Sequence, residues 1–402
     1  MTLRIAIVGI GVAGSVVAAR LARRTDCELT LLDRVETASQ ADSGTGLNIG
    51  PNGIASLAAL DPELARQVRA VSLPWSTWRI GLADGSPIAS FDLAQMAGGS
   101  GIRVRWAELY GVLRGWVAAQ TRFATDVTDA RYARAGGIEL KAGSTGNEWL
   151  GPFDLVVAGD GRFSRLRERL IGPVVAEHMG VALARLLWPD DSGGLIDDYE
   201  QWYCGHHRLF GYRVPGNALY LTASFPFVPG SPVPEEIKKP SVFRELITPD
   251  GPIVPGAAYL IDRLSDNVAN LHWARNQQAE IVYRDAPGRL LVLGDAAHPM
   301  VPTLGQGATQ ALEDGVAATQ AIEALLDSGR DDVPALTRSI ELRRTARVRH
   351  VRDLSWKASE PMLLGAEPLS AHAFIRSAAF LGELTKVFSQ HVGAASENAT
   401  PA

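Results

Sequence analysis

The chain contains little of what would tie it to a membrane, an oxidising compartment or a nucleic acid. Only two cysteines occur in 402 residues, Cys27 and Cys204, so disulfides are not its framework and a reducing, cytoplasmic setting is expected. No apolar stretch reaches the roughly 20 residues of a membrane-spanning helix. The formal net charge is −5 with both signs interspersed, whereas binding to phosphate backbones needs a basic face. We therefore expect no membrane and no nucleic acid among its partners.

What the chain does contain, close to its start, is a glycine-bearing turn between a strand and a helix. Gly9, Gly11 and Gly14 follow the apolar run 5–8, and residues 12–23 carry apolar side chains on one side of an expected helix. This spacing lets the backbone approach a pyrophosphate closely at a helix N-terminus.

A second short strand over 29–32 ends at Asp33, whose carboxylate can accept hydrogen bonds from the hydroxyls of an adenosine ribose. The pattern predicts a dinucleotide site and leaves NAD and FAD both open; a glycine turn without a ligand is the alternative. The candidate contacts are Gly9, Gly11, Val12, Ala13, Gly14, Asp33 and Arg34.

A second turn of this kind lies almost three hundred residues later. Residues 290–293 have the pattern of a buried strand, and Gly305-Gln306-Gly307 opens an expected helix over 307–327. A carboxylate at the strand end beside a helix N-terminus suits a polyol chain and an electron-rich ring edge, which a flavin has. The second turn therefore favours FAD, and a helix-capping cluster is the alternative. The candidate contacts here are Gly294, Asp295, Gly305, Gln306 and Gly307.

Antiparallel hairpins fill the gaps between the strand–helix segments. The clearest spans 208–227 around a turn at 215–217, and another spans 75–93. The sequence therefore predicts an α/β fold, with a Rossmann-like FAD-binding domain built from discontinuous segments, an inserted sheet-rich substrate domain and C-terminal helices. We place the FAD-binding domain at 1–72, 100–176 and 282–334, the substrate domain at 73–99 and 177–281, and the C-terminal helical segment at 335–402.

Three motifs in this order resemble the FAD-dependent aromatic hydroxylases of the para-hydroxybenzoate hydroxylase type. Besides the N-terminal turn, the chain has Asp160-Gly161-Arg162-Phe163-Ser164-Arg165-Leu166-Arg167, similar to the family's D-G-x-x-S-x-x-R. It also has Gly294-Asp295-Ala296-Ala297-His298-Pro299 followed by Gly305-Gln306-Gly307. Order and spacing match over residues 3–355, and the last motif is highly specific. Within the family, the chain is most similar to hydroxypyridine-carboxylate and salicylate-type monooxygenases.

The resemblance implies an enzyme that uses FAD, NADH or NADPH as a transient reductant, and O2. Such an enzyme hydroxylates a small aromatic or N-heteroaromatic substrate, like a hydroxybenzoate or a hydroxypyridine carboxylate, by way of a flavin hydroperoxide. The resemblance also implies an Asp295 contact to the ribityl chain, Asp160 and Arg167 serving FAD and the nicotinamide cofactor, and a homodimer. Two alternatives stay open: an epoxidase or natural-product tailoring oxidase on the same scaffold, and a flavin-binding module without turnover.

One position departs from the family pattern. An arginine that helps to hold the flavin usually opens the helix near residue 106, and the chain has Trp106 there. Either Arg103 or Arg105 replaces that arginine, or the flavin is held more loosely. We take Arg105 as the candidate cofactor contact.

The expected substrate residues lie mainly on the hairpin 208–227. Alternation places His206, Arg208, Phe210 and Tyr212 on one face, where an aromatic floor with a cation and a phenol suits an aromatic carboxylate. A solvated edge strand is the alternative. By similarity to relatives, Asn48 is a further substrate contact and Tyr212 matches a pocket tyrosine.

The remaining candidates concern catalysis and metals. His298 and Pro299 belong to the late motif near the flavin, so the expected catalytic residues are His298, Pro299 and Tyr212; a second interpretation has His298 holding the loop. Cys204, His206 and His207 are spaced too tightly for a tetrahedral metal site, and no metal is expected.

Overall fold

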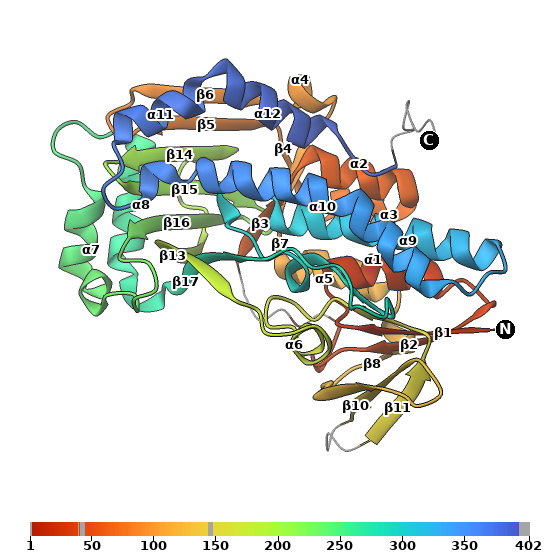
Figure 1. Ribbon diagram of the computed structural model, residues 1–402. Helices are drawn as coiled ribbons and strands as arrows, with labels where there is room; N and C mark the ends of the chain where they lie inside the picture. The colour runs from red at the N-terminus through yellow and green to blue at the C-terminus, as the bar shows by residue number, and fades with distance from the viewer. Residues whose placement is uncertain (1, 39, 41–44, 144–147, 394–402) are drawn as a thin grey trace.

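The structure is a computed structural model that describes residues 2–38, 40, 45–143 and 148–393. Its first layer is a parallel sheet in the strand order β18-β12-β1-β2-β8 (Figure 1). Ile7 of the central strand pairs with Leu31 on one side and Val157 on the other. The inner strands β12 and β18 and most of β1 are apolar, as buried parallel strands are. Their bounds are β1 Leu3–Val8, β2 Cys27–Leu32, β8 Thr121–Arg122, β12 Leu155–Ala158 and β18 Leu290–Val292.

Helix α1 (Val12–Leu21) connects β1 to β2, which confirms the predicted strand–helix–strand unit. It packs against α9 (Gly307–Asp327), so the N-terminal turn and the late glycine loop come together although they are far apart in sequence. The carboxyl ends of β1 and β18 therefore face the same region, where α1 and α9 both begin.

The second layer is a sheet of seven strands in the order β17-β13-β16-β15-β14-β5-β6. Both predicted hairpins are part of it, β5–β6 and β15–β16. Helices α7 (Pro240–Ile247) and α8 (Pro255–Asp266) cover one face, and the C-terminal helices pack on the other. The strand bounds are β5 Thr77–Leu82, β6 Pro87–Asp92, β13 Ala176–Pro189, β14 Tyr199–Cys204, β15 His207–Val214, β16 Ala218–Pro226 and β17 His272–Ala279.

Two small antiparallel sheets complete the strands. One has the order β3-β7-β4, with β3 Gly46–Ile49, β7 Gly101–Arg105 and β4 Leu73–Trp75. The other has the order β11-β10-β9, with β9 Asp129–Tyr132, β10 Ile138–Ala142 and β11 Glu148–Phe153, and lies at the outer end of the parallel sheet (Figure 1). The helices near them are α2 Pro51–Leu60, α3 Pro62–Ala70, α4 Leu93–Ala97, α5 Trp106–Gly115 and α6 Arg165–Leu170.

The C-terminal helices tie the layers together. Figure 1 shows α10 (Val333–Lys357) running across both sheets, with α11 (Pro368–Arg376) and α12 (Ala378–Ser389) beside the seven-stranded one. Short 3₁₀ turns lie at Ala118–Gln120, Glu235–Lys238, Val268–Asn270, Gly294–Ala296, Pro302–Leu304 and Glu360–Met362. Among the described residues, no helix is long and apolar enough to cross a membrane.

The predicted fold class is confirmed, with a Rossmann-like parallel core, a separate sheet-rich region and C-terminal helices. The domain boundaries stay a prediction. Helix α5 ends at Gly115, a residue that disfavours helix, and residues 118–120 form a 3₁₀ turn. The C-terminal tail from Ala394 lies outside the described residues.

Candidate active site

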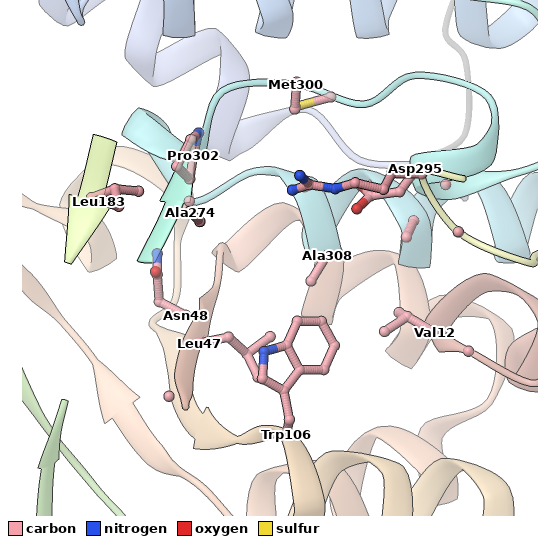
Figure 2. A pocket seen from close by; sticks show the side chains of 18 of the residues that line it. Val12, Leu47, Asn48, Trp106, Leu183, Ala274, Asp295, Met300, Pro302 and Ala308 are labelled. Atoms are coloured by element: carbon pink, nitrogen blue, oxygen red, sulfur yellow. The ribbon is translucent and has the colours of Figure 1, made fainter. Parts of the chain in front are cut away.

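A cavity of about 310 Å³ is lined from both layers. Figure 2 shows Val12 and Asp295 toward one end, which we call the dinucleotide end, and Asn48 toward the other. That second end, which we call the aromatic end, lies against the face of the seven-stranded sheet that carries Phe210 and Tyr212. The two predicted halves of the site therefore open into one space.

The first glycine turn is tight because its backbone touches other backbone. Gly9 has φ +85°, and a Cβ there would lie 2.5 Å from the carbonyl oxygen of Gly159. A Cβ on Gly14 would lie 2.1 Å from the carbonyl oxygen of Gly9. Gly11, by contrast, borders the cavity with Val12 and Ala13 at the N-terminus of α1. Gly9 and Gly14 thus shape the turn, and Gly11 opens its backbone to a ligand.

Asp33 holds this turn from behind. Its Oδ2 accepts a hydrogen bond from the Ile10 N–H at 2.7 Å, and its Oδ1 accepts one from the Val35 N–H at 3.1 Å. Asp33 is buried and is not part of the cavity lining, and Arg34 is exposed. The geometry gives Asp33 a positioning role at the turn.

The second turn presents a carboxylate and a helix N-terminus to the same cavity. Asp295 is exposed to it, and Gly305 and Gly307 line it beside Asp295. The first N–H groups of α9 lack helical partners and carry partial positive charge. Gln306 is fully buried, where its Oε1 accepts hydrogen bonds from Asn52 and Gln310 instead of lining the cavity.

The third motif braces this second turn. Arg167 donates to the carbonyl oxygens of Ala296 and Ala297 at 2.9 and 3.1 Å, and it does not line the cavity. Asp160 has a buried Oδ1 without a hydrogen-bond partner, and burial raises the pKa of its carboxyl group. Gly161 and Arg162, next to Asp160, do line the cavity.

These features fit FAD. An extended dinucleotide needs close backbone approach, which Gly11 provides, and N–H groups for its phosphates, which the start of α1 offers. A polyol chain needs a carboxylate, which Asp295 supplies next to the start of α9. The unpartnered oxygen of Asp160 is a further acceptor close to this path.

Four aromatic side chains line the aromatic end: Tyr199, Phe210, Tyr212 and Tyr220. The ring of Tyr212 lies 5.2 Å from that of Tyr199 and 5.1 Å from that of Tyr220, centroid to centroid. Burial raises the pKa of Tyr212 well above its usual range, and the neighbouring Tyr220 and Tyr199 add to the effect. Tyr212 therefore keeps its phenol proton at neutral pH.

Two arginines carry unpaired nitrogen atoms at this end. Arg185 lines the cavity; its Nη2 lies 2.7 Å from His272 Nδ1, and its buried Nε has no partner. Arg208 is 1 % exposed, with Nε and Nη1 unpartnered and its guanidinium 4.8 Å from the ring centroid of Phe210. Arg208 lies on the same sheet face as Phe210 but is not part of the lining.

The other two predicted substrate residues, Asn48 and His206, differ in whether they reach the cavity. Asn48 lines the cavity, and its Nδ2 is buried without a partner. His206 does not line it, and its Nδ1 lies 3.2 Å from the Pro361 carbonyl oxygen. The alternation assumed for His206 fails because β15 begins only at His207, so His206 is in the turn.

His298 and Pro299 lie behind the cavity wall. His298 is fully buried, and its Nε2 lies 2.5 Å from Oδ2 of Asp314. The carbonyl oxygen of Pro299 accepts a hydrogen bond from the Ala279 N–H. Neither residue is in the lining, so their geometry is that of positioning residues, the second interpretation given for His298 above.

Neither arginine near the start of α5 reaches the cavity. Arg103 bonds to the carbonyl oxygens of Pro74 and Asp197, and Arg105 pairs with Glu108. Trp106 itself lines the cavity. Arg103 and Arg105 are thus outside the cavity lining, and Arg105 as a cofactor contact stays a prediction.

Sequence reasoning missed several lining residues, chiefly Arg185, Tyr199 and Tyr220. The signal for Arg185 was a lone cation in the apolar run of β13, flanked by Ala184 and Leu186. Tyr199 and Tyr220 carried no local signal, since only the pairing of β14, β15 and β16 turns them toward Tyr212.

Comparison with known proteins agrees with this geometry. Residues 265–355 match the family described as FAD binding domain. The chain is 30 % identical over 370 residues to 3-amino-4-hydroxybenzoate 2-monooxygenase PtnB3 of Streptomyces platensis, covering 87 % of this chain and 85 % of that one. It is 26 % identical over 380 residues to 6-hydroxynicotinate 3-monooxygenase of Pseudomonas fluorescens, covering 88 % and 91 %. Its fold is similar to that of Klebsiella pneumoniae HpxO complexed with FAD and uric acid, with a TM-score of 0.75, 21 % identity and coverage of 96 % and 93 %.

The two relatives cover 87–88 % of this chain, and the FAD-bound structure covers 96 % of it. The chain therefore belongs to the FAD-dependent aromatic hydroxylases, and it is a monooxygenase that takes electrons from NADH or NADPH and uses O2 to hydroxylate an aromatic or N-heteroaromatic ring.

Proposed function

We propose that the substrate is a small aromatic or N-heteroaromatic acid, of the hydroxybenzoate or hydroxypyridine-carboxylate kind. The names of relatives support the ring type, because they act on 6-hydroxynicotinate, 3-amino-4-hydroxybenzoate and 3-hydroxybenzoate. The aromatic end supports it too, since Tyr199, Phe210, Tyr212 and Tyr220 offer ring faces against which a planar substrate packs.

The proposal that the substrate carries an acidic group rests on the unpaired positive charge at the aromatic end. Arginine does not lose its proton in a protein, and a buried guanidinium without an anion is costly. Among the described side chains, neither Arg185 nor Arg208 forms an ion pair, and each has buried nitrogen atoms without a partner. A substrate carboxylate supplies the missing partner. We assign it to Arg185, which lines the cavity, with Arg208 adding positive potential behind Phe210.

Two further side chains orient the ring. Tyr212 holds its proton and donates a hydrogen bond to a substrate oxygen or ring nitrogen, and the unpartnered Nδ2 of Asn48 donates a second one. Tyr212 is the proposed catalytic residue that touches substrate. Bound FAD, reduced by NADH or NADPH, supplies the activated oxygen, and the chain binds, orients and shields the reactants.

For the cofactor, we propose contacts from the residues that line the dinucleotide end. These are Gly11, Val12, Ala13, Gly294, Asp295, Gly305 and Gly307. Other predicted contacts have positioning roles: Gly9, Gly14 and Asp33 shape the first turn, and Arg167 and Gln306 brace the second. Arg105 pairs with Glu108, and Arg34 is exposed outside the lining. Asp160 offers its unpartnered oxygen near the same path.

The experiment compares acids with their uncharged amides. The purified holoenzyme is given NADH or NADPH with hydroxybenzoates and hydroxynicotinates, and then with the matching carboxamides. Acids should stimulate reductant oxidation and yield a hydroxylated product by mass spectrometry, and amides should not. Arg185→Met should raise KM for the acids about tenfold or more, the size of one lost charged contact. Equal activity on acids and amides would overturn the assignment.

We also propose a cytoplasmic homodimer. Two observations support it: both cysteines are unpaired, as in a reducing compartment, and Leu342, Leu364 and Leu381 are exposed on or between the C-terminal helices. Light scattering of the purified protein tests the dimer, and a monomeric mass would contradict it.

A further inference from the structure

An aromatic wall lines the cavity from helix α5. Trp106 and Tyr110, one helical turn apart, both belong to the lining, and their ring centroids are 5.2 Å apart. Figure 2 shows the indole of Trp106 pointing into the cavity between Leu47 and Val12. A ligand that extends from Val12 toward the aromatic end therefore lies beside this indole.

The wall is fixed to the first glycine turn at its far end. The guanidinium carbon of Arg114 lies 4.0 Å from the ring centroid of Tyr110. Arg114 is 4 % exposed, and it donates from Nε to the Ile10 carbonyl oxygen at 2.8 Å and from Nη1 to the Gln40 carbonyl oxygen at 2.6 Å. Residues four apart on a helix share a face, so Trp106, Tyr110 and Arg114 form one continuous ladder.

This wall offers the ligand no cation. Arg103 and Arg105, which precede the helix, are held by Pro74, Asp197 and Glu108, as described above. Arg114 is behind Tyr110 and is not part of the lining. Contact from α5 to a bound ligand is therefore made by ring faces.

We infer that Trp106 holds the flavin ring of bound FAD by aromatic contact, with Tyr110 and Arg114 positioning the indole. The flavin is a flat, polarisable ring system, and aromatic pairs add to the stability that burial gives. Salt screens ion pairs between exposed charges but has little effect on ring contacts. FAD affinity at this wall thus depends on an aromatic ring and adds little to the salt dependence of binding.

Titration of the apo-protein with FAD tests this inference. Trp106→Ala should raise the Kd for FAD about tenfold, and Trp106→Phe should raise it by no more than about threefold, since a ring remains. Trp106→Arg should make the Kd rise more steeply than in the wild type from about 0.05 to 0.5 M NaCl. A Kd unchanged in Trp106→Ala would overturn the inference.

Flavin emission gives a readout that a structural role would not move. An indole in contact with a flavin quenches its fluorescence, because it donates an electron to the excited ring and then takes it back. Bound FAD should therefore fluoresce several-fold more in Trp106→Phe and Trp106→Leu than in the wild type. Wild-type emission from a folded Trp106→Leu variant would contradict contact.

Trp116, directly after the same helix, provides the matched control. Its indole donates to Gln67 and lies under Arg23, and it is not in the cavity lining. Trp116→Phe should leave both the Kd and the emission at wild-type values. Circular dichroism of each apo-variant checks folding, and if Trp106→Ala fails to fold, the phenylalanine and leucine variants decide. Neither readout requires a substrate, so a failed acid panel leaves this inference intact.

Discussion

Asp314 accepts a hydrogen bond from His298 at 2.5 Å, and both side chains are fully buried. The same carboxylate accepts hydrogen bonds from the Gly294 N–H at 2.9 Å and from Arg344 Nε at 2.8 Å. Because Gly294 precedes Asp295, this buried network fixes the turn that presents Asp295 to the cavity. The late motif thus contains one residue that faces the cavity, Asp295, and another, His298, that holds the turn in place.

Removing the charge of Asp314 should destabilise the whole protein. Burial alone would raise the pKa of this carboxyl group, but its interaction with His298 and the positive charge of Arg344 outweigh burial and hold the pKa below its usual range. Its ionised form therefore contributes stability above the unfolded-state pKa of about 4, and that contribution is lost as pH falls below it. Asp314→Asn should cost about 3–5 kcal/mol at pH 7 by urea unfolding.

The pH dependence of stability distinguishes the loss of the negative charge from poor packing of the asparagine amide. The difference in free energy of unfolding between wild type and Asp314→Asn should be about 1 kcal/mol smaller near pH 3 than at pH 7. Asp353→Asn, at an exposed carboxylate, should leave stability within about 0.5 kcal/mol at both pH values. A gap that stays constant with pH would refute the electrostatic explanation.

Asp295 should matter to the cofactor and not to folding. Its side chain is exposed in the cavity, so Asp295→Ala removes a ligand contact and leaves no cavity in a packed core. FAD affinity should fall about tenfold or more, the size of a charged hydrogen bond, while the apo-protein unfolds within about 0.5 kcal/mol of wild type. Asp250→Ala, at an exposed loop residue outside the lining, serves as the control. Wild-type flavin content in Asp295→Ala would show that the cofactor end is misassigned.

Tyr212 should affect turnover without affecting FAD. Tyr212→Phe keeps the ring stacked against Tyr199 but removes the hydroxyl, so kcat should fall about tenfold at unchanged flavin content. Because its pKa is raised well above the usual range, Tyr212 should contribute no inflection to the rate between about pH 6 and 9 in the wild type. Tyr132→Phe, at a half-exposed tyrosine on β9, is the control. Full activity in Tyr212→Phe would show that the substrate binds elsewhere.

The sequence predicted the dinucleotide end better than the aromatic end, for a physical reason. Contact between backbone and a phosphate needs glycine at fixed spacing and a helix directly after it, so Gly11 and Gly307 leave a local signature. The aromatic end is built by strand pairing, and no local pattern turns Tyr199 of β14 and Arg185 of β13 toward one cavity. His206 shows the same limit, because the alternation rule holds only once the first residue of the strand is known.

The motifs predicted which residues form the turns, but they did not predict where the side chains of these residues point. His298 lies in the most specific motif of the chain, yet its imidazole points toward Asp314 of α9, sixteen residues later in the sequence. Arg167 likewise points to the carbonyl oxygens of Ala296 and Ala297. A motif contains residues that support its loop as well as residues that contact a ligand, and the sequence alone does not show which residue has which role.

Gly305 links the two ends of the cavity, and this contact can be tested directly. Its φ is +63°, and a Cβ there would lie 2.0 Å from Nδ2 of Asn48, the unpartnered donor at the aromatic end. Gly305→Ala should therefore strain the backbone by about 1–2 kcal/mol and also push Asn48 or the loop aside. Gly98→Ala is the matched control, because Gly98 has φ +70° but no atom within 4 Å of the added carbon.

Gly305→Ala should lower both the thermal unfolding temperature and kcat/KM more than Gly98→Ala does. The double variant Asn48→Ala with Gly305→Ala should recover part of the lost stability, since the clash is gone while the backbone strain remains. Equal losses in the two glycine variants would mean that the contact with Asn48 contributes nothing.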